Sequence, residues 1–166
     1  MSGSRSAAVF GLLFFILPMI ESGLITSLAS PLANGPLFIA LALATLVCVR
    51  RRATAVTLTL AGATWRDLVL LTAHAPTLIG AVVLISIVWI GSVLVETRSL
   101  VARSIVAIAG AAAYLVGVAG VARLAMLLGL PADNVWPSIY VITASGLLAL
   151  FVAAIFGRVD SSVLHH

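Results

Sequence analysis

Long apolar runs separated by short polar stretches make up most of the chain. The runs cover about residues 7–28, 36–52, 68–95, 104–128 and 137–157. A helix needs about 20 apolar residues to cross the hydrocarbon core of a membrane. The pattern therefore predicts an all-α fold, a single transmembrane domain over residues 1–166 in the form of a polytopic helical bundle with about five membrane-spanning helices.

The amino-acid composition also indicates a membrane protein. Apolar residues make up 63% of the 166 residues and charged residues 8%, whereas soluble domains have about 45–50% and about 25%. The formal net charge of +4 is carried by arginine alone. Because the arginines flank apolar runs, they indicate anionic lipid headgroups rather than nucleic acid as the partner.

Residues 53–66 are too polar to predict a membrane span. Val56, Leu60 and Ala63 recur at helical spacing, which favours a short cytoplasmic helix lying along the membrane face. Trp65 is then expected at headgroup level and Arg66 in water. A simple cytoplasmic connector is the alternative.

Charge at the boundaries of the runs predicts the orientation. The positive-inside rule places residues 50–52 and Arg66 in the cytoplasm, together with Arg5. The N-terminus is then inside, the C-terminus outside, and the protein lies in the cell membrane. If residues 68–95 cross once, Arg98 and Arg103 are external, against the rule. A re-entrant first half of that run is the alternative.

Three polar side chains inside or beside the runs are candidates for function: Glu21, His74 and Arg123. A charge inside a span is costly and usually faces protein or water. These residues could serve a proton-linked carrier or a membrane enzyme. Alternatively, Glu21 is a hydrogen-bonded group near the outer interface and His74 a structural histidine.

Small residues recur at every fourth position in the last two predicted spans. Such stripes let helices approach closely, either within the chain or against a partner subunit. The residues are Ala109, Ala113 and Gly117 in one span, and Ser145, Ala149 and Ala153 in the other.

Catalytic and metal-binding motifs are missing from the sequence. It contains no P-loop, no HExxH and no GxSxG pattern, its five acidic residues form no aspartate-rich motif, and its one cysteine excludes a CxxC site. We therefore expect no catalytic residue, no metal site and no cofactor, and the sequence favours a non-enzymatic protein over an enzyme.

One segment resembles a known family. Over about residues 46–95, an apolar helix, an arginine run, the segment LAGATWRD and a long span follow one another. This order resembles the permease domain of FtsX/MacB-type ABC transporters. The resemblance implies that a separate ATPase subunit contacts Arg50, Arg51, Arg52, Trp65, Arg66 and Asp67.

Three functions remain open at this stage. The first is a permease-like subunit of a multi-subunit transporter, coupled to an ATPase through residues 50–67. The second is a structural or accessory subunit that packs against other membrane subunits. The third is a small proton-linked carrier or membrane enzyme. Membrane lipids are expected partners in each case, and nucleic acid in none.

Overall fold

The computed structural model describes residues 2–27, 36–49, 51–71, 74–94 and 100–130, together with Leu147 and Phe151. This part of the chain is all-helical, which confirms the all-α prediction. Arg50 and the predicted span 137–157, with Ser145, Ala149 and Ala153, lie outside the described residues, apart from Leu147 and Phe151. The helices are α1 (Ser2–Ser27), α2 (Pro36–Cys48), α3 (Arg52–Val69), α4 (Pro76–Leu94) and α5 (Leu100–Leu127).

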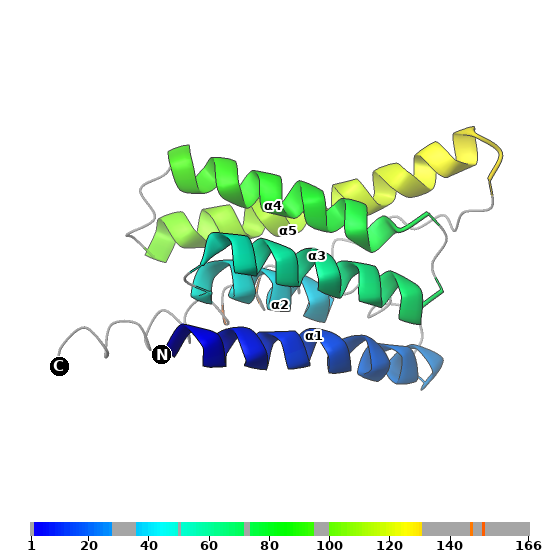
Figure 1. The fold of residues 1–166 in the computed structure, drawn as a ribbon. Coiled ribbons are helices and arrows are strands. Elements are labelled where there is room, and N and C mark those ends of the chain that lie inside the picture. Colours follow the sequence, from blue (N-terminus) through cyan, green and yellow to red (C-terminus); the bar gives the residue numbers. More distant parts are fainter. Residues whose placement is uncertain are drawn as a thin grey trace.

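Successive helices alternate in direction along one bundle axis (Figure 1). Gly11 lies against Leu58 whereas Glu21 meets Arg66, so α1 and α3 run parallel. Gly91 lies against Val106 whereas Gly80 lies against Val118, so α4 and α5 are antiparallel. One end of the bundle therefore carries the starts of α1, α3 and α5. We call it the Arg51 end, and the opposite one the Glu21 end.

Helix α2 forms the centre of the bundle. It packs against α1, α3 and α5, and Phe38, Ile39 and Ala42 are fully buried. A helix that is apolar on every face is one that is buried on every face. This position explains why α2 shows no polar side, although its 13 residues extend only about 20 Å.

Large apolar side chains cover the outside of the bundle. Leu12, Ile16 and Ile20 on α1, Trp89 on α4 and Val116 on α5 are exposed. Two described helical segments are long and apolar enough to cross a membrane, Pro76–Leu94 and Ser104–Leu127, and the apolar parts of α1 and α2 are shorter, Ala7–Ser22 and Leu37–Leu46. An apolar surface of this extent indicates association with a membrane.

The prediction of one continuous span over residues 68–95 is wrong at its start. Helix α3 continues to Val69, and α4 begins only at Pro76. Between them the backbone of Leu71, His74 and Ala75 is left-handed. Proline suits the first turn of a helix because it has no N–H to leave unpaired, and it disfavours helical backbone in the residue before it.

Helix α3 is present, as predicted for residues 53–66, but it lies within the bundle rather than across its end (Figure 1). Ala55, Thr59 and Ala63 are buried, and α3 packs against α1, α2 and α4. The expectation that Arg66 lies in water is wrong, because its exposed fraction is only 4%. Trp65 donates its indole N–H to the carbonyl of Phe15 at 3.1 Å.

Close contact between α4 and α5 depends on glycine. A Cβ atom at Gly80 would lie 2.9 Å from the ring of Tyr114, and one at Gly117 would lie 3.2 Å from the Cα of Gly80. Of the predicted stripe on α5, Gly117 therefore packs inside the chain. Ala113 is half-buried, and Ala109 is exposed.

We predict that Gly80→Ala destabilises the protein by about 1–3 kcal/mol, because the added methyl group overpacks a filled contact. Gly120→Ala is the matched control, since a Cβ there meets nothing within 4 Å. It should leave stability unchanged or raise it by up to about 1 kcal/mol. Thermal unfolding in detergent, followed by circular dichroism, measures both. Equal melting temperatures for the two variants would contradict the proposed close packing.

Candidate functional site

A group of buried polar side chains lies near the Glu21 end of the bundle. Each member comes from a part of the fold that is otherwise apolar, and four of the described helices contribute. We call this group the Arg66 cluster. It consists of Glu21 on α1, Arg66 and Asp67 on α3, Thr77 on α4 and Tyr114 on α5.

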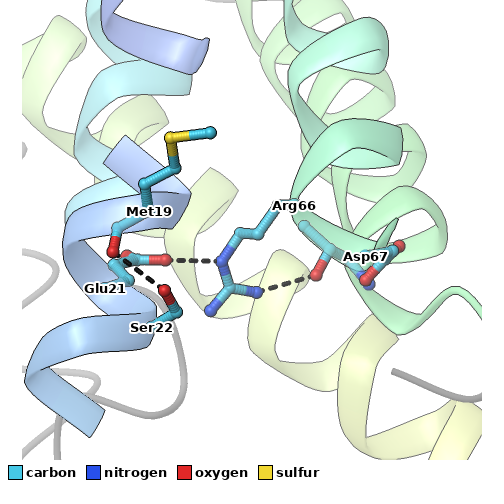
Figure 2. A network of polar contacts seen from close by, with 6 residues as sticks. Met19, Glu21, Ser22, Arg66 and Asp67 are labelled. Carbon is cyan, nitrogen blue, oxygen red and sulfur yellow. Dashed lines mark hydrogen bonds and ion pairs between the residues drawn. The ribbon is translucent and has the colours of Figure 1, made fainter. Parts of the chain in front are cut away.

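Arg66 is the centre of the cluster. Its Nε donates to Glu21 Oε2 at 2.7 Å, and its Nη1 donates to Thr77 Oγ1 at 2.7 Å. Figure 2 shows the guanidinium and the Glu21 carboxyl group pointing toward each other across the gap between α1 and α3. The guanidinium carbon also lies 5.9 Å from the ring centre of Phe38 on α2, within cation–π range. One side chain thus connects α3 to α1, α2 and α4.

Asp67 holds the start of α4. Its Oδ1 accepts from the backbone N–H of Thr77 at 3.1 Å, and its Oδ2 accepts from the backbone N–H of Leu78 at 2.9 Å. The first N–H groups of a helix have no partner within that helix, and its N-terminus attracts negative charge. Asp67 therefore caps α4 from a neighbouring helix.

Two polar atoms of the cluster are unsatisfied. Glu21 Oε1 and the Tyr114 hydroxyl are buried and find no hydrogen-bond partner among the described residues. The Tyr114 hydroxyl lies beside Thr77, but the geometry falls short of a hydrogen bond. A buried polar atom without a partner costs about 1–3 kcal/mol. If the cluster served packing alone, both atoms would be expected to have hydrogen-bond partners.

The formal charges of the cluster do not cancel. Arg66 contributes +1, and Glu21 and Asp67 contribute −1 each when ionised, so the described groups sum to −1. The N-terminus of α4 offsets part of the charge on Asp67, since a helix start carries roughly half a positive charge. Glu21 is paired directly with the Arg66 guanidinium at 2.7 Å, so the remaining formal negative charge belongs to Asp67. Within the part of the chain that the structure describes, Glu21 Oε1 is an acceptor that meets no donor, so the site can accept a hydrogen bond from a bound group.

The other predicted site residues lie elsewhere. His74 is exposed in the connection between α3 and α4, and Arg123 is exposed on α5. Arg51 and Arg52 are exposed at the start of α3, whereas Asp67, predicted as a partner contact, is buried at 7% exposure. No group of three histidine, cysteine, aspartate or glutamate side chains that could hold a metal occurs within the described ranges.

Sequence analysis singled out Glu21 and Arg66 but did not pair them. They are 45 residues apart, and only the parallel packing of α1 and α3 brings them together. Thr77 and Tyr114 were not singled out at all. One signal was available, because the dipeptide Arg66-Asp67 ends a helix that is otherwise uncharged beyond Arg52.

Comparisons with protein families, with curated proteins and with solved structures find no match to this chain. The resemblance to the FtsX/MacB-type permease domain therefore stays a prediction, and any function must be argued from the site itself.

We predict that Arg66→Met destabilises the protein by about 3–5 kcal/mol, because the substitution leaves buried carboxylates without their counter-charge. The double variant Glu21→Gln/Arg66→Met should recover part of that loss. Arg52→Met, on the exposed side of the same helix, is the control and should change stability by no more than about 0.5 kcal/mol. Thermal unfolding in detergent compares the three. A single variant no less stable than the double would show that the pair is not coupled.

Proposed function

We propose that this chain is a membrane-embedded transport protein, located in the cell membrane, whose polar site is the Arg66 cluster. The observation that carries the proposal is the buried Oε1 of Glu21, which has no hydrogen-bond partner among the described residues and lies next to an ion pair within an apolar bundle. Ionisable groups inside membrane proteins commonly mark the paths of protons, ions or substrates. The nearby Tyr114 hydroxyl, which also lacks a hydrogen-bond partner in the described part of the chain, adds a second polar group to the site.

The geometry supports protons as the transported or coupling species. A proton that binds Glu21 Oε1 converts the carboxylate to a neutral carboxylic acid, and the formal charge of the cluster rises from −1 to zero. The same step removes the negative charge that faces Arg66, so the contact between α1 and α3 weakens. Release of the proton restores the ion pair. Proton binding is thereby linked to the packing of two helices.

The position of the cluster also fits a transport role. Glu21 lies in the last two turns of α1, and Thr77 is the second residue of α4. The cluster is therefore close to the Glu21 end of the bundle, where the path to water is short.

We predict that the protein, purified and reconstituted into liposomes, conducts protons when a potassium gradient with valinomycin sets a membrane potential. A pH-sensitive dye enclosed in the liposomes reports the flux. Glu21→Gln should lower the flux at least about tenfold, equivalent to about 1.4 kcal/mol. Ser22→Ala is the matched control, because the neighbouring Ser22 hydroxyl donates only to the carbonyl of Met19, at 2.8 Å (Figure 2), and this variant should conduct normally.

Two results would contradict the proposal. One is a wild-type flux no greater than that of empty liposomes. The other is a Glu21→Gln variant that is folded and conducts as well as the Ser22→Ala control. Circular dichroism of each reconstituted variant checks the folding, so a loss of flux can be assigned to the carboxyl group.

An ATPase-coupled permease-like subunit is the second candidate. It is favoured by the exposure of Arg51 and Arg52 at the start of α3, the helix whose last turns hold Arg66. A partner that moved this exposed end would also move the cluster. Arg66 and Asp67 would then act inside the bundle, rather than as contacts with the ATPase as the resemblance implies.

We predict that an ATPase is recovered with the protein purified from its native membrane in mild detergent, and that Arg51→Glu/Arg52→Glu abolishes this recovery. The two glutamates would repel the acidic groups of the ATPase with which the two arginines pair. Thr57→Ser, on the same exposed side of α3, should keep the ATPase. If the wild-type protein carries no ATPase, the second candidate is wrong.

A further inference from the structure

The outer face of α3 is unusual for a helix that contains two arginines and an aspartate. Beyond Arg52, the side chains exposed along this face are those of Ala53, Thr57, Ala61, Thr64 and Leu68. They follow one another at intervals of three or four residues, which places them on one side of the helix. None of them is charged.

The two hydroxyl groups on this face are satisfied. Thr57 donates to the carbonyl of Ala53 at 2.9 Å, and Thr64 donates to the carbonyl of Leu60 at 3.0 Å. Threonine that bonds to its own helix in this way tolerates an apolar environment, since no polar group then needs water. The outer face of α3 can therefore be covered by lipid chains.

Beyond Arg52, the charged side chains that lower the hydropathy of α3 point away from this outer face and into the bundle. Arg66 and Asp67 are buried in the Arg66 cluster, with their side chains directed at α1 and α4. Helix α3 is also long enough to cross the membrane. Its 18 residues extend about 27 Å, close to the hydrocarbon thickness of about 30 Å. Low average hydropathy here reflects polar groups that face protein rather than lipid.

We propose that α3 crosses the membrane alongside the other helices, so that the Arg51 end of the bundle lies on the cytoplasmic face against anionic lipid headgroups. Because each helix reverses the direction of the one before it, adding α3 to the crossings changes the side of every segment that follows. The connection between α4 and α5 is then on the same side as Arg51, and the predicted span 137–157 returns the chain to that side.

The distribution of arginine supports this arrangement. By sequence position, six of the nine arginines fall at the starts of α1, α3 and α5 or between the helices that the Arg51 end joins, whereas Arg123 is near the opposite end, Arg66 is buried and Arg158 lies outside the described residues. Arg98 and Arg103 contradict the positive-inside rule if α3 lies on the membrane surface, and they obey it in this arrangement. The six are Arg5, Arg50, Arg51, Arg52, Arg98 and Arg103.

Cysteine labelling tests the proposal directly. In a Cys48→Ser background, single cysteines are placed by Ala53→Cys, Leu71→Cys, Thr97→Cys and Leu128→Cys, two at each proposed side. Ala53, Leu71 and Leu128 are exposed, and Thr97 belongs to the connection between α4 and α5. The reagent is a membrane-impermeant maleimide, applied to intact cells and then to permeabilised cells.

We expect the cysteines at positions 71 and 128 to react in intact cells, and those at 53 and 97 to gain labelling only after permeabilisation. If α3 lies on the cytoplasmic surface instead, position 97 alone reacts in intact cells, and positions 53, 71 and 128 are protected. That pattern, or any other in which positions 53 and 71 share a side, overturns the proposal. Labelling of all four after permeabilisation shows that each variant is present and accessible.

Discussion

The burial of Arg66 is the constraint on which the rest of the structure depends. A guanidinium group stays protonated in proteins, so it must find oxygen atoms and an aromatic face within an apolar bundle. Glu21, Thr77 and Phe38 provide them from three different helices. The alternating arrangement of the helices is what brings these partners to the same height in the bundle.

The same requirement fixes where α4 begins. Asp67 follows Arg66 directly, so the carboxylate enters the bundle with the guanidinium and bonds to two N–H groups at the start of α4. Pro76 supplies no N–H of its own, and the residues before it adopt left-handed backbone. Two adjacent charged residues thus end one helix and position the next. The break between α3 and α4, which the hydropathy pattern does not show, is therefore set by polar contacts.

The sequence predicts features that depend on neighbouring residues, such as helix positions, better than features that depend on residues far apart in the chain, such as the pairing of side chains. Apolar runs predicted α1, α2 and α5 closely, because burial or lipid contact on most sides leaves a continuous signal. The predicted span 68–95 merged the end of α3 with α4, since residues on both sides of the break are apolar. The pairing of Glu21 with Arg66 depends on helix packing, which periodicity does not show. For the same reason, Arg66 was expected in water although its partner lies in α1.

The separation of 45 residues between Glu21 and Arg66 has a consequence for biosynthesis. The ribosome makes the acid first, and α1 and α2 emerge before the helix that carries the guanidinium. If α3 enters the bilayer after them, Glu21 is already present as a counter-charge. Arg66 then has a partner as soon as α3 inserts. Reversing this order would expose an unpaired arginine during insertion. Chain direction, and not only the final contacts, thus suits the assembly of this protein.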